Sequence, residues 1–300
     1  MLTNFFSNTK PVISVFIIGL FLCYTTIGFF IGTVPLVSFG LFFWFFVLFG
    51  VANFVNSRNN LTFDNSFFFL FFVILLGYFS EAIQLNSIFY ASLILMIYMR
   101  RVYSLQSPKN SIKKLFDSGF WIGICFLIEP FSILFFLMTY FAIILHQHLD
   151  YRKLLTPILG LLTPCIIFFT YHFWYDSMDN VYALLDWYTS YDFTIYTNVK
   201  YQFSIGVLLF LLLISLFLKT PKALAVKNAF RKNWILISLH LLLALVLMVI
   251  IKDRNGTEIL YLLFPVTIII ANGFELFQKK WFADIILLLI FLGSFVPFLL

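Results

Sequence analysis

A glutamate and a proline interrupt one of the most apolar stretches of this sequence. Glu129 lies within CFLIEPFSILFF, residues 125–136, and carries the only charge between Phe120 and Leu145. An ionised carboxylate at the centre of a membrane costs about 3 kcal/mol or more, so such groups are rare and mostly functional. Glu129 is therefore either a functional group in a cavity, or it lies outside the hydrocarbon because the chain turns there.

Two further positions could do chemistry at a membrane surface. Glu81 follows an apolar run and is one of the acids that the charge distribution described below places on the external side. The segment KDRNGTE, residues 252–258, places Arg254 at a junction between apolar stretches, and a planar guanidinium suits phosphate. An ion pair of Arg254 with Asp253 or Glu258 is the simpler alternative. The Asn-Gly pair of this segment predicts a tight turn.

The remaining polar side chains form no motif of a soluble enzyme. The sequence holds no Gly-rich nucleotide loop, no HExxH and no GxSxG. His146 and His148 could bind a metal in principle, but two histidines without a nearby third ligand are more typical of a linker. The three cysteines lie apart within apolar runs. We therefore expect neither a metal nor a cofactor.

The composition indicates that much of the protein surface must lie in contact with membrane lipid. Of the 300 residues, 62% are hydrophobic and 11% are charged, whereas about 25% of the residues of a soluble domain are charged. The apolar runs are continuous rather than short and alternating, which excludes a transmembrane barrel. The sequence thus predicts an all-α polytopic membrane protein, with one transmembrane domain over residues 1–300.

The apolar runs predict nine membrane segments and one undecided stretch. Spanning a bilayer takes about 20 apolar residues, and fewer where helices are packed in protein. The nine segments lie near residues 11–31, 36–55, 67–79, 88–99, 154–175, 202–218, 234–251, 259–275 and 282–300. Residues 119–145 could form one long helix, or a hairpin of two short helices that turns at Glu129-Pro130.

The distribution of basic residues favours the hairpin. With a hairpin, 16 of the 19 Lys and Arg residues fall on one side of the membrane, whereas a single helix divides them almost evenly. The 16 are Lys10, Arg58, Arg100, Arg101, Lys109, Lys113, Lys114, Arg152, Lys153, Lys219, Lys222, Lys227, Arg231, Lys232, Lys279 and Lys280. Cytoplasmic loops are enriched in Lys and Arg, and proline suits a turn better than a helix interior.

This bias predicts about eleven membrane segments, with the N-terminus cytoplasmic and the C-terminus external. It also accounts for the net charge of +6 without a nucleic-acid partner. The one long external loop covers residues 176–202, and residues 181–188 within it could form a short helix on the membrane surface. The Trp and Tyr residues of the loop are typical of an interfacial belt, and a lid over an external site is the alternative.

The order of the segments resembles a known family of membrane enzymes. Four stretches carry the likeness: ILLGYFSEAIQLNSIFYASLILMIYMRR (74–101), FDSGFWIGICFLIEPFSILFFLMTYFAIIL (116–145), LLTPILGLLTPCIIFF (154–169) and DRNGTEILYLLFPVTIIIANGFE (253–275). In this order they resemble the GT-C superfamily, integral-membrane glycosyltransferases that take their sugars from polyprenyl phosphates. The chain also resembles an uncharacterised family of Phe-rich bacterial inner-membrane proteins.

The resemblance implies catalytic carboxylates in external loops, and here this sequence departs from the pattern. The superfamily places a catalytic aspartate in a long first external loop, whereas residues 32–35 form a short loop without an acid. Asn86 falls near the place of a second-loop acid, with Glu81 five residues earlier. Glu129 occupies the position of a hairpin lysine. The candidate catalytic residues are thus Glu81 and Glu129.

The resemblance also implies a site for a lipid phosphate. Arg254 matches the phosphate-binding arginine of the superfamily, and Tyr261 and Pro265 match the rest of its late motif loosely. We expect a degenerate GT-C-like protein that binds a polyprenyl phosphate or a similar lipid headgroup at the external face, in envelope glycan or lipid assembly. The alternatives are an active glycosyltransferase with displaced carboxylates, a transporter, and a structural subunit held by membrane-protein partners.

Overall fold

The structure is a computed structural model, and it confirms the all-α fold. It describes residues 2–34, 38–146, 149–187, 189, 191–225, 229–252, 254–277 and 279–300, and these contain helices and loops but no strand. Eight helices within these ranges are long and apolar enough to cross a membrane. Pro35, His148, Tyr188, Lys227 and Asp253 of the sequence interpretation lie outside the described residues.

Contacts divide the chain into two compact units. Unit 1 comprises Met1–Leu85, Asp192–Lys227 and Arg254–Leu300, and unit 2 comprises Asn86–Tyr191 and Asn228–Asp253. The single transmembrane domain expected over residues 1–300 stays a prediction, since it concerns how these units assemble in a bilayer. The two candidate sites described below both belong to unit 1.

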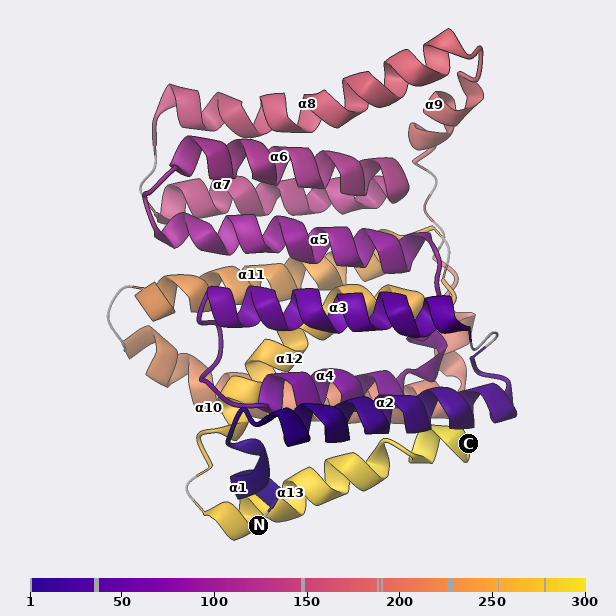
Figure 1. Ribbon diagram of the computed structural model, residues 1–300, viewed down its shortest axis with the longest axis vertical. Helices are drawn as coiled ribbons and strands as arrows, with labels where there is room; N and C mark the ends of the chain where they lie inside the picture. The colour runs from indigo at the N-terminus through magenta and orange to yellow at the C-terminus, as the bar shows by residue number, and fades with distance from the viewer. Residues whose placement is uncertain are drawn as a thin grey trace. The chain divides into compact units, whose positions relative to one another are not determined.

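The helices of unit 1 include six of the predicted membrane segments, and Figure 1 shows them as ribbons. Its elements are α1 (Leu2–Phe6), α2 (Pro11–Ile31), α3 (Phe39–Arg58), α4 (Phe67–Tyr78), η1 (Ser80–Ala82), η4 (Thr194–Thr197), α10 (Val199–Ala225), η5 (Thr257–Ile259), α12 (Leu260–Phe274), α13 (Lys280–Gly293) and η6 (Val296–Phe298). Every residue of α12 is buried, and α12 packs against α4 and α10. Small residues allow this close packing: the backbone of Gly273 lies against Ser215 of α10.

Hydrogen bonds between distant residues mark two ends of unit 1. At the end that contains α1, the backbone N–H of Ser66 donates to the Phe6 carbonyl at 3.1 Å. At the end that contains η1, the Ser204 hydroxyl donates to the Tyr78 carbonyl at 2.8 Å. We call these the α1 end and the η1 end. The charge analysis predicts that the α1 end is cytoplasmic and that the η1 end is external.

The elements of unit 2 include a set of helices that run side by side (Figure 1). They are α5 (Ser87–Tyr103), η2 (Ser104–Gln106), α6 (Ser111–Ile128), η3 (Pro130–Phe135), α7 (Phe136–Leu145), α8 (Tyr151–Trp174), α9 (Asp179–Leu184) and α11 (Ala229–Ile250). The backbones of α6 and α8 nearly touch, because Gly119 and Gly160 face each other where any side chain would collide with the opposite backbone. Such small-residue contacts are a common means of helix association in membranes.

The chain breaks at Glu129 rather than continuing as one helix. Helix α6 ends at Ile128, and Glu129 is extended, with φ −137° and ψ 100°. Its N–H donates to the Cys125 carbonyl at 2.8 Å, and Pro130 begins a 3-10 helix that leads into α7. Helices α6 and α7 pack against each other, so this stretch is the hairpin that the charge distribution favours. The side of the membrane on which the tip lies stays a prediction.

Several helix boundaries differ from the sequence-based expectation: for example, the segments expected over 202–218 and 282–300 are α10, Val199–Ala225, and α13, Lys280–Gly293. The first helix of the hairpin begins at Ser111 rather than near 119, because Lys113, Lys114 and Asp117 extend it with polar turns that the apolar pattern does not reveal. In the loop over 176–202, the expected surface helix over 181–188 is α9, Asp179–Leu184, which begins and ends earlier. None of its residues is buried, as suits a helix at a membrane surface.

Candidate functional site

Three distant segments meet at the η1 end of unit 1. Residues 80–84 contain η1, residues 192–201 lead into α10, and residues 254–258 precede α12. Each of these segments brings charged or hydroxyl side chains to a helix terminus, where backbone groups need partners from outside the helix. The sequence interpretation placed two candidate residues, Glu81 and Arg254, in the first and third segments.

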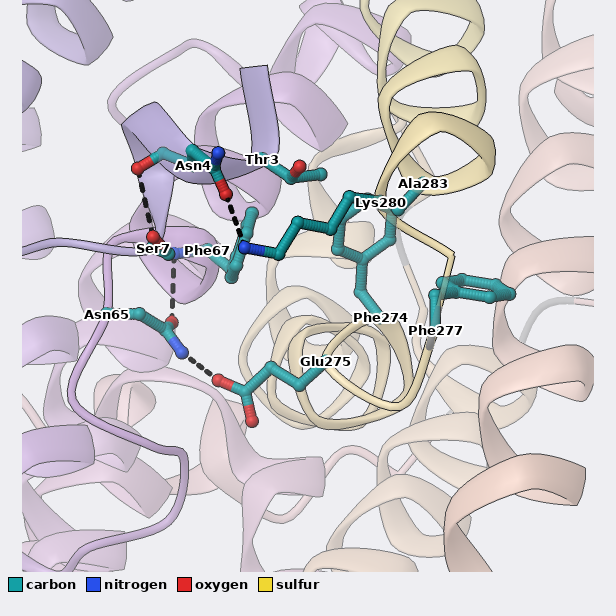
Figure 2. A pocket seen from close by; sticks show the side chains of 10 residues that line it. All are labelled: Thr3, Asn4, Ser7, Asn65, Phe67, Phe274, Glu275, Phe277, Lys280 and Ala283. Atoms are coloured by element: carbon teal, nitrogen blue, oxygen red, sulfur yellow. Dashed lines mark hydrogen bonds between the residues drawn. The ribbon is translucent and has the colours of Figure 1, made fainter. Parts of the chain in front are cut away.

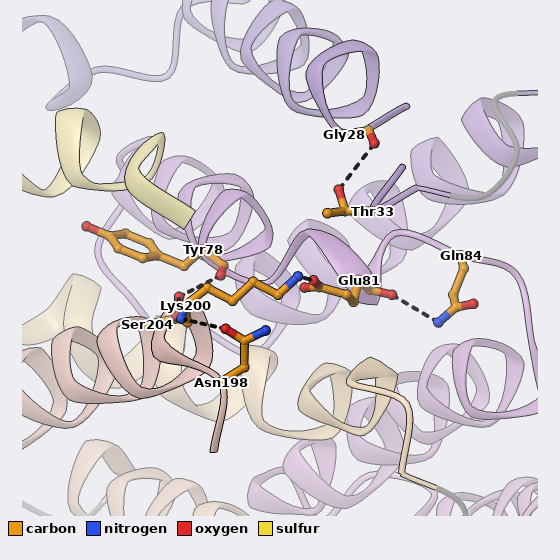
Figure 3. Close-up of polar contacts among 8 residues, drawn as sticks. All are labelled: Gly28, Thr33, Tyr78, Glu81, Gln84, Asn198, Lys200 and Ser204. Carbon is orange, nitrogen blue, oxygen red and sulfur yellow. Dashed lines mark hydrogen bonds and ion pairs between the residues drawn. The ribbon is translucent and has the colours of Figure 1, made fainter. Parts of the chain in front are cut away.

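Glu81 forms an ion pair with Lys200 at the centre of this cluster (Figure 3). The Lys200 ammonium donates to Glu81 Oε1, and the two side chains are only 20% and 18% exposed. The Glu81 backbone carbonyl accepts a hydrogen bond from Gln84 Nε2 at 3.0 Å. The carboxylate is thus already engaged by a cation in this conformation, and a general base must have a lone pair available to its substrate.

A second carboxylate of the cluster, that of Glu258, is fully buried. The Tyr196 hydroxyl donates to Glu258 Oε1, and the Asn255 N–H donates to Oε2 at 3.3 Å. Burial, and then the charge of Glu258, raise the pKa of Tyr196, so the phenol stays neutral and remains a donor. Buried carboxylates persist in proteins only when donors satisfy them in this way.

Gly256 brings the third segment against the first. Its φ is +88°, which favours glycine, and the Asn-Gly turn predicted from the sequence is therefore present. A Cβ at this position would lie 3.2 Å from Glu81 Cβ and would collide with the Tyr201 hydroxyl. This hydroxyl is buried, and no described residue forms a hydrogen bond with it. The turn at residues 255–256 is thus tightly packed beside Glu81 and a polar atom that a ligand could use.

Arg254 lies at the edge of the cluster, where it is partly exposed. Its guanidinium carbon is 4.3 Å from the centroid of the Phe193 ring, and one of its terminal nitrogens donates to the Asp192 carbonyl at 3.3 Å. Hydrogen bonds from Thr194 lower the pKa of Asp192, and the charge of Arg254 contributes to this shift. The stacked ring and the carbonyl restrict the guanidinium to one orientation on the surface.

The sequence matches one family of proteins over its whole length. The family of unknown function DUF6427 matches residues 1–300, which is the entire sequence. The chain belongs to the DUF6427 family. No curated protein and no solved structure matches it. The activity of this DUF6427 protein must therefore be inferred from its own residues.

The other predicted site residues of the DUF6427 protein lie elsewhere. Tyr261 is in the first turn of α12 and only 2% exposed, and Pro265 is buried one turn further on. Glu129 is a partly exposed residue of unit 2, at the turn between α6 and η3. The structure therefore brings the turn after Arg254 against Glu81, and it places Tyr261 in the core.

Sequence reasoning did not identify the partners that fix the two carboxylates. Lys200 is one of only three basic residues predicted on the external side, and this scarcity is a signal that could have marked it. Tyr196 gave no signal, because a tyrosine in an aromatic loop is expected at any membrane interface. Within the described ranges, no group of three or more His, Cys, Asp or Glu residues could hold a metal ion.

Proposed function

We propose that this DUF6427 protein binds a phosphate-bearing lipid headgroup, such as that of a polyprenyl phosphate, at the η1 end of unit 1. In this proposal the protein is a GT-C-like protein of a bacterial inner membrane, with eleven membrane segments, a cytoplasmic N-terminus and an external C-terminus. It serves envelope glycan or lipid assembly as a binding component. The observation that carries the proposal is the placement of Arg254, stacked on Phe193 at the rim of a polar cluster.

Arg254 has the chemistry that a phosphate monoester or diester requires. A guanidinium binds phosphate oxygens through two parallel N–H donors, and it remains charged at all physiological pH values. Stacking on Phe193 reduces the conformational entropy that binding would otherwise cost. The guanidinium is partly exposed at a predicted membrane face, where the phosphate of a lipid lies.

The state of the two carboxylates supports binding rather than sugar transfer. Glycosyl transfer needs a base or a metal-holding carboxylate beside the acceptor. Glu81 is paired with Lys200, and Glu258 is buried under Tyr196 and Asn255. In an active transferase the acceptor hydroxyl would have to compete with Lys200 for the Glu81 carboxylate or use its remaining lone pairs, whereas the binding function makes no demand on this carboxylate.

Native mass spectrometry of the purified protein with added undecaprenyl phosphate tests this proposal. We expect the protein to retain undecaprenyl phosphate but not undecaprenol, which has the same tail without the phosphate. Arg254→Ala should weaken retention about tenfold or more, since it removes charge-assisted hydrogen bonds. Arg254→Lys should recover part of it, because an ammonium supplies the charge without the planar pair of donors.

Lys252→Ala is the matched control. It removes the same charge from the same loop, but Lys252 is 47% exposed and pairs with Asp186 at 3.6 Å. The proposal would be rejected if a folded Arg254→Ala variant retained as much undecaprenyl phosphate as the wild type does. Transfer of a sugar from a polyprenyl-phosphate donor, lost in Glu81→Gln, would instead identify the active glycosyltransferase.

A further inference from the structure

A second polar pocket lies at the opposite, α1 end of unit 1 (Figure 2). Its volume is about 220 Å³, several times the roughly 30 Å³ that one water occupies in the liquid. It is lined by Thr3, Asn4, Ser7, Asn65, Phe67, Phe274, Glu275, Phe277, Lys280 and Ala283. These residues belong to α1, to the start of α4, to the end of α12, to the start of α13 and to the loop residues next to these helix ends. The proposed phosphate site at the η1 end shares none of them.

One wall of the pocket carries a carboxylate that the protein satisfies only in part. Glu275 Oε1 accepts a hydrogen bond from Asn65 Nδ2, and Asn65 is itself held by the Phe67 N–H at 3.1 Å. Glu275 Oε2 is buried, and no described residue forms a hydrogen bond with it. A buried acceptor without a donor costs about 1–3 kcal/mol, so a ligand that donates to it would be favoured.

The opposite wall carries a cation. The Lys280 ammonium donates to Asn4 Oδ1 at 2.9 Å, which leaves two of its three N–H groups for other acceptors. Asn4 belongs to α1, which two hydrogen bonds of 2.7 Å from Thr3 to Asp284 fasten to α13. The pocket thus presents a negative group and a positive group on separate walls, both supported by ordered neighbours.

An apolar groove shares two of its lining residues with the pocket. Phe274 and Phe277 line the pocket and also a second cavity of about 390 Å³. The remaining walls of the groove are Phe210, Leu211, Ile214, Ser215, Leu218, Ile270, Phe282 and Ile286, from α10, α12 and α13. Phe210 is 64% exposed at the side of unit 1 that a membrane would cover. Polar and apolar compartments that share a wall fit a molecule with a charged head and a hydrocarbon tail.

We infer that this compound cavity binds a phospholipid whose headgroup carries a primary ammonium and a phosphate, as in phosphatidylethanolamine. The ammonium lies at Glu275, the phosphate lies at Lys280, and one acyl chain follows Phe274 and Phe277 into the groove. The α1 end is the predicted cytoplasmic face, so the lipid comes from the inner leaflet.

Charge and hydrogen bonding select this headgroup over two common alternatives. A primary ammonium donates hydrogen bonds to Glu275 Oε2, whereas the quaternary ammonium of phosphatidylcholine has no N–H to donate. Phosphatidylglycerol can donate hydroxyl groups to Glu275, but its headgroup carries no positive charge to offset that of the carboxylate. Lys219 on α10 also acts on Glu275 electrostatically, but it lies over the ring of Phe63 at 4.7 Å and is not part of the pocket wall.

The experiment is a competition among lipids that differ only in headgroup. The full-length protein is reconstituted with equal amounts of phosphatidylethanolamine, phosphatidylcholine and phosphatidylglycerol with identical acyl chains, and retained lipid is identified by native mass spectrometry. We expect phosphatidylethanolamine to be enriched over both others. Glu275→Gln should abolish that preference, and Lys280→Gln should weaken retention of all three phospholipids, because each carries a phosphate.

Two control variants make the result specific. Asp64→Asn removes an exposed acid near the same end of unit 1, and Lys279→Gln removes the exposed base next to Lys280. Both should leave the lipid preference unchanged. Equal retention of the three lipids by the wild type, or an unchanged preference in a folded Glu275→Gln variant, would overturn the inference. Neither result bears on undecaprenyl phosphate at the other end, so the two proposals stand or fall separately.

Discussion

Glu81 and Lys200 form an ion pair between residues 119 positions apart in the sequence, and this pair joins η1 to the first turn of α10. Fully exposed pairs contribute little to stability, because water screens them. This pair is four-fifths covered, so removing one partner leaves a partly desolvated charge behind. The pair should therefore stabilise the contact between η1 and the first turn of α10.

The variants Glu81→Gln and Lys200→Met should each lower the free energy of unfolding by about 1–3 kcal/mol. The double variant should lose less than the sum, because the second substitution removes the charge that the first left uncompensated. Denaturant unfolding in micelles measures the cycle, and Lys252→Met is the exposed control. Additive losses in the cycle would show that the two side chains do not interact.

Gly256→Ala should destabilise the protein. Position 256 has φ +88°, where a side chain costs roughly 1–2 kcal/mol, and a Cβ there collides with Tyr201. Gly206→Ala is the opposite case: its surroundings are open, and alanine in a helix interior should stabilise by roughly 0.5–1 kcal/mol. Thermal unfolding of the two variants should give shifts of opposite sign. A neutral Gly256→Ala would mean that the turn relaxes without cost.

The carboxyl of Glu275 should make stability depend on pH. Burial raises its pKa from the ordinary 4.5 to about 7, although the charge of Lys219 opposes this shift. Between these two values the unfolded chain loses the proton while the folded protein keeps it, so the free energy of unfolding falls as pH rises through this window. Above about pH 7 the loss is complete and constant.

Glu275→Gln should remove this part of the pH dependence and stabilise the protein most at the alkaline end. Melting temperatures at about pH 5 and about pH 8, in detergent without added phospholipid, measure the effect against Asp64→Asn. Detergent matters here, because a bound ammonium would favour the ionised carboxylate. A wild type and a Glu275→Gln variant with parallel pH profiles would contradict the assignment.

The hairpin predicts a definite sidedness. In a background where Cys23, Cys125 and Cys165 are replaced by alanine, Glu129→Cys should react with a membrane-impermeant thiol reagent added outside intact cells. Leu149→Cys, which is 66% exposed and lies in the next loop, should react only after the membrane is opened. Labelling of both positions from the outside would contradict the positive-inside assignment.

Local patterns in the sequence located the membrane helices, but they did not predict the short helix α1, Leu2–Phe6. The turn at Asn255-Gly256 was predicted from the residue pair itself, whereas the turn at Glu129-Pro130 was predicted mainly from the distribution of Lys and Arg along the chain, with proline as a local support. The ends of helices were predicted less accurately: α6 begins at Ser111, well before the start of the apolar run near residue 119. A helix can continue beyond the hydrocarbon region through turns of polar residues, and the hydropathy of the sequence does not predict such turns.

The composition of the sites was only partly predictable. Arg254 was identified because it is a charge at a junction between apolar runs, which is a local signal, and Glu81 was identified through the resemblance to the GT-C superfamily. The contact of Tyr196 with Glu258 and that of Asn65 with Glu275 join residues 62 and 210 positions apart. No periodicity or spacing in one sequence encodes such pairs, since they depend on which helices pack together.

The complete burial of α12 has a consequence for biogenesis. A helix that is covered on all sides by protein gains little from leaving the translocon into lipid, particularly when it carries a polar Asn272 that donates to the Leu61 carbonyl at 2.8 Å. The ribosome makes α4 and α10 before α12, and both pack directly against it. Both neighbours are therefore already synthesised when α12 emerges. Helix α12 can then enter the membrane by packing against α4 and α10 rather than by partitioning alone into lipid.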